Sequence, residues 1–441
     1  MINQYENLSY LSPFSGKTIP LKELCLSITD CPHSTPKWSE EGMIVIRNFN
    51  IKNGELDLSS PSYTDHGSYL ERNKRATPEP GDIIITREAP MGEVCMIPDG
   101  VECCLGQRMV LLKVDEQKVS NQYLLFALQS EFVQKQISKS DRTGSTVSNL
   151  CIPDLKEIEV PIFENSKAIA DVLKAITSKI RVNNLINSEL EAMAKTLYDY
   201  WFVQFDFPDA NGKPYKASGG KMVYNDTLKR EIPQDWKVNK LVEITSLIRR
   251  GISPKYTEES GTQVLNQKCI RNQKISFEDS RRHQAIMDDN DERLLKPFDV
   301  LVNSTGVGTL GRVAYVKRLA EKKTTVDSHV SIVRANPDKV CPRYLAWKLM
   351  RYQPVIEAAA NGSTGQVELS KSFLEDLDVI IPSGSVAKKF SEFVEPIAIS
   401  VAKRESENEQ LISLRDWLLP MLMNGQVTVK PSTEAQEAQH G

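Results

Sequence analysis

The sequence lacks the features that mark several common classes of protein. It has no run of about 18 consecutive apolar residues, so we expect no membrane span. The start of the chain shows neither the basic nor the apolar segment of a secretion signal, and we expect none. Its 8 cysteines show no C-x-x-C spacing. We therefore expect reduced thiols in a cytosolic chain, and no zinc site.

The common signatures of enzyme active sites are also missing. No G-x-x-x-x-G-K-[ST], H-E-x-x-H or G-x-S-x-G segment occurs. Residues 306–311 (GVGTLG) fit G-x-G-x-x-G, but a dinucleotide site requires a helix to begin directly after the glycines. Residues 312–316 (RVAYV) are instead typical of a strand. We therefore interpret this segment as a strand–loop–strand turn, and we expect no catalytic residue, cofactor or metal in the chain.

The charge balance is not that of a typical nucleic-acid-binding protein. The 441 residues carry 55 Lys and Arg against 58 Asp and Glu, a net charge of −3. Residues 20–160 hold 15 basic and 21 acidic residues, whereas residues 232–384 hold 23 basic and 19 acidic residues. Only the second region has the basic excess that would neutralise phosphates. The first region would have to gather its cations on one face, or rely on a DNA-binding partner.

What the sequence does contain is an internal duplication. TPKWSEEG at residues 35–42 returns as SPKYTEESG at residues 253–261, with hydroxyl replacing hydroxyl and aromatic replacing aromatic. Further pairs of matching segments follow in the same order, at offsets of 217 to 221 residues: GMIVIR at 42–47 with GTQVLN at 261–266, PGDIII at 80–85 with PFDVLV at 297–302, GST at 144–146 with GST at 362–364, and LKEIEV at 155–160 with LEDLDV at 374–379.

A repeat of half the chain length indicates two homologous domains and a pseudo-twofold molecule, not a solenoid. Two related recognition surfaces suit a polymer that is itself nearly twofold, and duplex DNA is the leading candidate. The repeated residues would form the scaffold. The positions that differ between the copies are where two different ligand sequences could be read.

The pattern along the chain predicts a mixed α/β protein in which each copy is followed by a long helical region. Strands are expected at residues 83–85, 300–302 and 313–316, and short helices at 120–138 and 341–359. The expected parts are a first recognition domain (20–163), a central helical region (164–207), a linker (208–231), a second recognition domain (232–383), a C-terminal helical region (384–427) and a disordered tail (428–441).

Apolar residues spaced by three and four predict amphipathic helices over residues 166–203 and 385–423. Helices this long are unlike isolated surface helices, so the two should pack against each other. Pro396 should start a new helix or kink the second one. Asn187 and Asn408 occupy matching seam positions. They could fix the register of the pair, or they could simply be solvated where the seam drifts.

The strings that end each helical region resemble those of one known family. They are TLYDYWFVQFDFP at residues 196–208 and LRDWLLPMLMNGQV at residues 414–427, together with IPQDW at residues 232–236. In these strings and in its duplicated architecture, the chain is similar to the specificity subunit of type I restriction-modification enzymes over residues 20–427. Trp and Tyr residues at the helix ends, such as Tyr198, Tyr200, Trp201 and Trp417, would suit partner docking, although core packing explains them equally.

The resemblance implies a non-catalytic subunit that binds double-stranded DNA. Each recognition domain would read one half of a split target. The two long helices would form an antiparallel coiled coil that sets the unread gap. It also implies two methyltransferase subunits that bind S-adenosylmethionine and modify adenine, and two restriction subunits that use ATP and Mg²⁺. Two other classes remain open: a stand-alone two-domain DNA-binding regulator, and a nuclease or methyltransferase with an unrecognised site.

Polar residues near the turns of both copies are the candidate DNA contacts, because Arg, Lys, Asn, Gln, Ser and Thr donate to phosphates and base edges. The candidates in the first copy are Lys37, Arg47, Asn48, Arg87, Gln107, Arg108, Arg142 and Ser145. Those in the second copy are Arg249, Arg250, Lys255, Tyr256, Asn266, Gln267, Arg271, Asn303, Ser304, Thr305, Arg312 and Ser363. For each of them, an ordinary solvated turn is the alternative interpretation.

Overall fold

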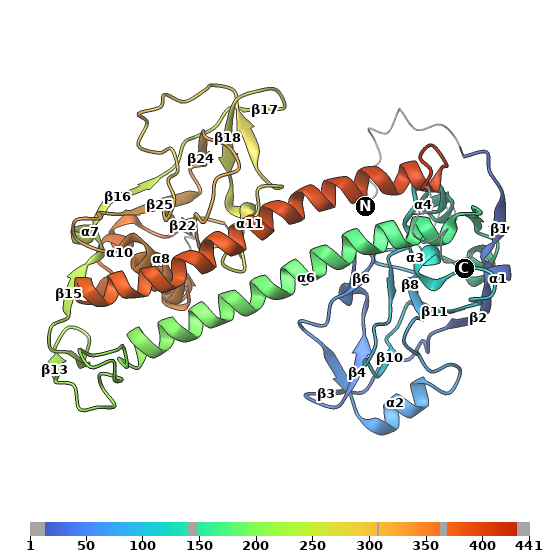
Figure 1. The fold of residues 1–441 in the computed structure, drawn as a ribbon, viewed down its shortest axis with the longest axis horizontal. Coiled ribbons are helices and arrows are strands. Elements are labelled where there is room, and N and C mark those ends of the chain that lie inside the picture. The colour runs from blue at the N-terminus through green and yellow to red at the C-terminus, as the bar shows by residue number, and fades with distance from the viewer. Residues whose placement is uncertain (1–13, 140–148, 307, 362–367, 430–441) are drawn as a thin grey trace, which may run out of the picture. The chain divides into compact units, whose positions relative to one another are not determined.

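A computed structural model describes residues 14–139, 149–306, 308–361 and 368–429 (Figure 1). The chain forms two compact units, residues 1–182 with 407–441 and residues 183–406. The two longest helices, α6 (Ser166–Tyr198) and α11 (Gly384–Met423), contribute segments to both units. Each unit is described below by itself. None of the described helices combines the length and the apolar character that crossing a bilayer requires.

The first unit contains the first mixed α/β domain. Its remaining elements, in chain order, are β1 (Thr18–Pro20), α1 (Leu21–Leu24), β2 (Cys25–Asp30), β3 (Trp38–Ser39), β4 (Met43–Ile46), η2 (Asn48–Asn50), β5 (Ile51–Lys52), β6 (Glu55–Leu56), β7 (Ser62–Thr64), α2 (His66–Arg72), β8 (Ile83–Thr86), β9 (Val94–Met96), β10 (Cys103–Leu105), β11 (Met109–Val114), α3 (Asn121–Gln129), α4 (Glu131–Lys139), α5 (Ile152–Lys156) and β12 (Glu159–Pro161).

Two four-stranded sheets build this domain. One has the strand order β2-β11-β8-β9 with antiparallel pairing throughout. The other has the order β10-β4-β7-β3, in which only β10 and β4 pair in parallel. A short antiparallel pair, β1 with β12, closes the domain.

The second unit contains the second mixed domain. Its elements, in chain order, are the π-helical turn η3 (Asp199–Val203), β13 (Met222–Asn225), β14 (Arg230–Pro233), β15 (Lys237–Lys240), α7 (Leu241–Ile244), β16 (Thr245–Arg250), β17 (Tyr256–Thr257), β18 (Thr262–Leu265), η4 (Gln267–Cys269), β19 (Ile270–Arg271), β20 (Lys274–Ile275), β21 (Arg281–His283), β22 (Val300–Asn303), β23 (Val313–Tyr315), β24 (Thr324–Val326), β25 (Val330–Ala335), α8 (Pro342–Arg351), α9 (Gln353–Asn361), α10 (Lys371–Glu375) and β26 (Asp378–Ile381).

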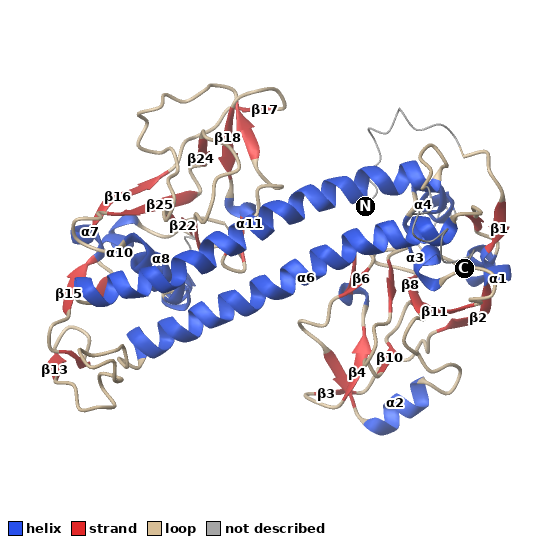
Figure 2. Ribbon diagram, in the orientation of Figure 1, coloured by secondary structure: helices blue, strands red, loops and turns tan. Residues whose placement is uncertain are grey.

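The second domain repeats the topology of the first, strand for strand. Its sheets have the orders β16-β25-β22-β23 and β17-β21-β18-β24, again with a single parallel pair, β18 with β24. The closing pair is β15 with β26. The duplication predicted from sequence is therefore present in the fold, and the mixed α/β class is confirmed (Figure 2).

Strand β8 is covered on both faces, which explains why its residues are apolar without alternation. Ile83 and Ile85 contribute to the core beneath α3 and α4, whereas Ile84 contributes to the core between the two sheets. Successive side chains of a strand point to opposite faces, so a strand covered on both faces must be apolar at every position. Strand β22 repeats the pattern, with Val300 and Val302 in one core and Leu301 in the other.

Within each unit, the segments of the two long helices run antiparallel. In the first unit Lys179 pairs with Glu407 at 3.5 Å, and Leu173 shares a core with Leu422. In the second unit the ring of Tyr198 lies 5.8 Å from that of Phe390. Asn187 and Asn408 are both buried, so the solvated interpretation of these residues is wrong.

The expectation that Pro396 would start a new helix is also wrong, since α11 is a single helix over this position. Proline removes one hydrogen-bond donor from the helix interior. Apolar neighbours keep this part of α11 in place: Val394 is buried in the core of the second unit, and Ile397 packs against it. Packing of the apolar face supplies most of the stability of a helix in a protein.

Candidate nucleic-acid interface

The repeated TPKW and SPKY segments place an aromatic residue on an edge strand in each domain, in the sheet that contains the parallel pair. Trp38 begins β3 and lies opposite Thr64 of β7, and Tyr256 begins β17 and lies opposite His283 of β21. Trp38 is 46% exposed and Tyr256 is 37% exposed. Two large aromatic rings therefore lie at matching surface positions.

In the first domain, the guanidinium of Arg47 lies over two exposed rings. Its carbon is 5.0 Å from the centre of the Trp38 ring and 4.8 Å from that of Phe49. Arg47 follows β4 directly, and Asn50 Oδ1 accepts a hydrogen bond from its backbone N–H at 2.9 Å. The backbone and the side chain of this arginine are thus both fixed.

In the second domain, Arg281 takes the same place from a different strand. Its guanidinium carbon lies 3.7 Å from the centre of the Tyr256 ring. The Tyr256 hydroxyl faces Asp327 Oδ2 at 3.5 Å. Burial raises the pKa of the Tyr256 hydroxyl, and the nearby Asp327 carboxylate raises it further, so the ring remains a neutral phenol.

The strand registers show that the arginine has changed position between the copies. Arg47 matches Asn266 in the duplicated segments. Arg281 pairs with Val264 of β18, and the equivalent pair in the first domain is Ser62 with Val45. The first domain therefore carries Arg47 and Ser62 where the second carries Asn266 and Arg281.

Several other candidates are exposed or half-buried, and most of these are paired with a carboxylate or hydrogen-bonded to a neighbour. The ion pairs are Lys37 with Asp65, Arg108 with Glu88, and Arg249 with Glu292. Asn48 donates to the backbone oxygen of Glu88, and Gln107 donates to that of His33. Lys255 and Arg271 are exposed. Arg312 donates to the Gly308 oxygen at 2.8 Å.

Arg87 and Arg250 hold backbone inside their own domains. The Arg87 guanidinium donates to the Leu150 oxygen at 2.9 Å and pairs with Asp30, also at 2.9 Å. The Arg250 guanidinium donates to the Leu369 oxygen at 3.2 Å and pairs with Glu368. These contacts fix the segment that precedes α5 in one domain and α10 in the other.

Five further candidates are wholly or partly buried in the second domain: Asn266, Gln267, Asn303, Ser304 and Thr305. Asn303 and Ser304 are buried, and the Ser304 hydroxyl lies 2.6 Å from that of Ser331. Asn303 donates to the Gln267 oxygen at 3.0 Å. Asn266 begins η4 and accepts from the Lys268 backbone at 2.8 Å. The Thr305 hydroxyl lies 2.6 Å from His329 Nδ1. The remaining candidates, Arg142, Ser145 and Ser363, lie outside the described residues.

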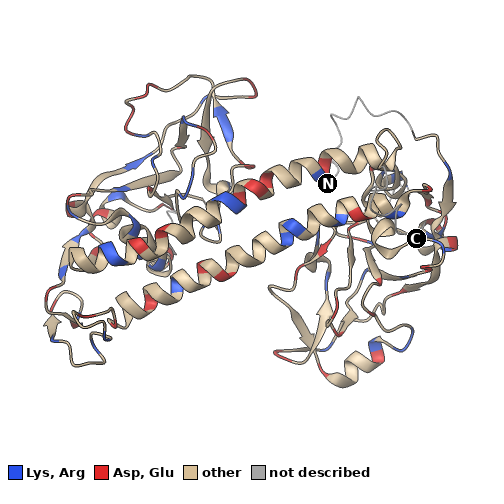
Figure 3. Ribbon diagram, viewed as in Figure 1, with Lys and Arg blue, Asp and Glu red and all other residues tan. Residues whose placement is uncertain are grey.

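Trp38, Phe49 and Arg281 were not among the residues predicted from sequence to contact DNA. The repeated aromatic was visible, but the strand pairing that brings Arg281 onto Tyr256 was not. Figure 3 shows Lys and Arg interspersed with Asp and Glu within each domain. Net charge could therefore not have located the interface, because cations and anions are mixed in both domains.

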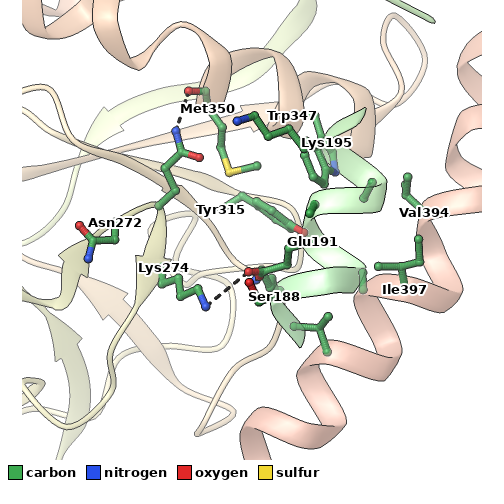
Figure 4. Close-up of a pocket in the computed structure, with 16 residues that line it drawn as sticks. Ser188, Glu191, Lys195, Asn272, Lys274, Tyr315, Trp347, Met350, Val394 and Ile397 are labelled. Carbon is green, nitrogen blue, oxygen red and sulfur yellow. Dashed lines mark hydrogen bonds and ion pairs between the residues drawn. The ribbon is translucent and has the colours of Figure 1, made fainter. Parts of the chain in front are cut away.

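The second unit also holds a cavity of about 270 Å³ between its helix segments and its α/β domain (Figure 4). Glu191 of α6 pairs there with Lys317 and with Lys274, the latter at 3.4 Å. Burial alone would raise the pKa of Glu191, but these two ammonium groups outweigh burial and lower it. Lys317 also lies 3.7 Å from Glu405 of α11. The ion pairs therefore join the domain to both helix segments.

Comparison with known proteins agrees with this architecture. Residues 16–192 match the family model described as the type I restriction modification DNA specificity domain. The chain is 25% identical over 358 residues to the type I restriction enzyme MjaIX specificity subunit of Methanocaldococcus jannaschii, covering 79% of this chain and 78% of that one. It is 21% identical over 319 residues to the HindI specificity subunit of Haemophilus influenzae, covering 61% and 69%.

Among solved structures, the fold is similar to that of the type I restriction-modification S subunit from M. genitalium. The TM-score is 0.56 at 17% sequence identity, and the match covers 93% of this chain and 96% of that chain. The chain is thus similar, over most of its length, to specificity subunits of type I restriction-modification systems. Specificity subunits are the non-catalytic components of these systems, and the matched domain is one of DNA specificity.

Proposed function

We propose that this chain reads a bipartite DNA target, with one half read by residues 20–163 and the other by residues 232–383. The observation that carries this proposal is the duplicated topology with exchanged surface residues. Two domains share one strand order, yet they present Arg47 and Ser62 in one copy and Asn266 and Arg281 in the other. A common scaffold with different polar side chains is what two different half-sites require.

The helical regions, residues 164–207 and 384–427, would separate the two readers and set the length of the unread gap. A helix rises about 1.5 Å per residue, so the 33 residues of α6 correspond to about 50 Å. The linker would be residues 208–231, and residues 428–441 a tail without a reading role.

The same helices would dock the partner subunits. Apolar residues of α6 and α11 stay exposed within each unit, and exposed apolar groups of this size support an interaction surface. They are Val182, Leu185, Met193, Phe393, Ile399, Leu414 and Trp417. We infer two methyltransferase subunits that carry S-adenosylmethionine, and two restriction subunits that use ATP and Mg²⁺. No cofactor is assigned to this chain.

Mapping methylated adenines across the genome of the host, with and without the gene, tests the proposal. We expect methylation at a split sequence with a fixed gap, and its disappearance when the gene is deleted. The chain purified from that host should retain a methyltransferase subunit. A chain that purifies alone and leaves methylation unchanged would instead be a stand-alone DNA-binding regulator.

A further inference from the structure

We propose that Arg47, held on Trp38 and Phe49, and Arg281, held on Tyr256, are the arginines through which the two domains contact duplex DNA. This inference rests on the proposed function and assigns residues to it. Each half of the target would be approached by one of these stacked arginines.

The first argument is that these two guanidinium groups are free to bind. Many arginines of the chain are already paired with a carboxylate: Arg87, Arg108, Arg249, Arg250, Arg282, Arg293, Arg334, Arg343, Arg351 and Arg415. Within the described ranges, neither Arg47 nor Arg281 forms an ion pair, and both are exposed. A DNA acceptor could therefore bind them without first displacing an anion.

The second argument is that the rings hold the guanidinium groups in a productive orientation. A guanidinium that lies on an aromatic face uses the face of its plane and keeps its N–H donors at the edge. Those edge donors form a fork that suits two neighbouring acceptors, as on a phosphate or on the O6 and N7 atoms of guanine. A side chain held by a ring loses less conformational freedom on binding than a free one.

The third argument is the recurrence of the arrangement from different chain positions. Arg47 follows β4, whereas Arg281 begins β21, and the residues at the exchanged positions are Ser62 and Asn266. Inheritance from a common ancestral domain accounts for the two aromatic residues, but not for an arginine that sits on a different strand in each copy. The recurrence points to a shared requirement for a cation on this ring.

The test uses the full chain in complex with its methyltransferase subunit and a duplex that contains the mapped target. We expect Arg47→Ala and Arg281→Ala each to weaken binding by about 10-fold, within the range of a bidentate base contact. If the arginine reads guanine, variant and parent should differ least on duplexes substituted at one base pair of the matching half. If it binds phosphate, all sequences should weaken alike and the salt dependence should fall by about one counterion.

Matched controls separate DNA contact from folding and from charge. Lys22 of α1 and the exposed Lys240 pair with Glu157 and Asp378 on other elements of the two domains. Lys22→Ala and Lys240→Ala remove the same charge and should leave binding within about twofold. Trp38→Leu keeps Arg47 but removes one of the two rings that hold it, and it should weaken binding by about 3-fold with little change in melting temperature.

Binding and salt dependence equal to the parent in both arginine variants would overturn the inference, and so would equal losses in the two lysine controls. Failure of the proposed function is a separate outcome, because the parent complex would then show no preference for a bipartite duplex. If the parent complex prefers the mapped target and both arginine variants bind it equally well, the inference fails but the proposed function stands.

Discussion

In each domain an arginine holds an equivalent backbone segment in place, but the arginine comes from a different strand in the two domains. In the first domain Arg87, directly after β8, donates to the Leu150 oxygen and pairs with Asp30 at the end of β2. In the second domain Arg250, at the end of β16, donates to the Leu369 oxygen. The residue that follows β22 there is Ser304. The arginine has moved to the other strand and pairs there with Glu368, while the contact to backbone is kept.

The same exchange occurs at the exposed aromatic of each domain, where Arg47 and Arg281 come from different strands. Both cases teach that a position in space is retained while its source in the sequence changes. Strands β4 and β7 are neighbours about 5 Å apart, and β2 and β8 flank the single strand β11, so a long arginine side chain can reach one site from either strand. Comparing residues by alignment offset alone therefore misses both equivalences.

The largest effect is expected from exchanging one whole recognition domain. Replacing residues 20–163 with the same region of a homologue should change one half of the methylated target and leave the other half unchanged. Each domain has its own hydrophobic core, so we expect each to read its half of the target independently. Sequencing of methylated adenines measures the result. A change in both halves would show that the domains do not read separately, and the exchange of residues 232–383 is the matched control.

The next effect concerns the helices that the two domains share. Ser188 and Val401 line one cavity in the second unit, so these antiparallel segments face each other near Asn187. Inserting seven residues after Asn187 and seven after Val401 lengthens both helices by about 10 Å, which is about three base pairs. We expect methylation to move to sites with a longer gap. Methylation at the original spacing by a fully active double-insertion variant would contradict the proposal that the helices set the length of the unread gap.

Replacing Arg87 should lower the free energy of unfolding more than replacing Arg250. The Arg87 side chain is 12% exposed and its partner Asp30 is 22% exposed, whereas Arg250 and Glu368 are 36% and 51% exposed. Arg87→Ala leaves a mostly buried carboxylate and an unpaired oxygen, and we expect a loss of about 2–3 kcal/mol. Arg250→Ala should cost less than about 1 kcal/mol.

Urea unfolding of the full chain, followed by a probe in each domain, measures both losses. The double variant Asp30→Arg with Arg87→Ser moves the arginine of the first domain to the strand that it occupies in the second. It should recover part of the loss of Arg87→Ala, and no recovery would show that the two contacts are not equivalent.

A smaller effect sharpens the contrast in how each domain is joined to its helix segments. Strand register places Pro98 in the first domain at the position of Lys317 in the second. Lys317→Met removes the cation between Glu191 and Glu405, and we expect a loss of about 2 kcal/mol at neutral pH. Lys317→Met combined with Glu191→Gln should restore part of it.

The pH dependence of that loss has a definite sign. The folded-state pKa of Glu191 lies below its ordinary value of 4.5. Its contribution to the free energy of unfolding is therefore present above about pH 4.5 and is lost as the pH falls through the folded value. The difference between parent and Lys317→Met should narrow at acid pH. A difference that stays constant down to pH values of about 3 would contradict the ion-pair account.

Much of the fold could be predicted from sequence, because the evidence was local or repeated. The apolar runs at residues 83–85 and 300–302 are strands, and the helical periodicity over residues 166–203 and 385–423 corresponds to α6 with η3, and to α11. Pro396 misled because a local propensity was weighed without the packing that holds α11. Propensity is a weak guide wherever tertiary contacts decide.

The interface was harder to predict because it depends on which strands are neighbours. Arg87 and Arg250 are typical DNA-contacting residues by type, yet their side chains are occupied within the domain. Arg281 was overlooked because Tyr256 lies in another strand of the same sheet. Residue type predicts what a side chain can bind, whereas strand register decides whether the side chain is free to do so.

The smallest expected effect concerns the two matching asparagines of the long helices. Asn187 is buried and its Oδ1 has no hydrogen-bond partner among the residues the structure describes, whereas the buried Asn408 does have an interaction. Replacing an unpaired buried amide with an apolar side chain is neutral or favourable, whereas removing a satisfied one costs about 1 kcal/mol. We therefore expect Asn187→Leu to leave the free energy of unfolding unchanged or to raise it slightly, and Asn408→Leu to lower it. Urea unfolding of the two variants side by side gives the comparison, with Leu185→Asn, an exposed change on the same helix, as the control. Equal losses at positions 187 and 408 would show that both asparagines are satisfied in the folded protein, and that both help to fix the register of the helix pair.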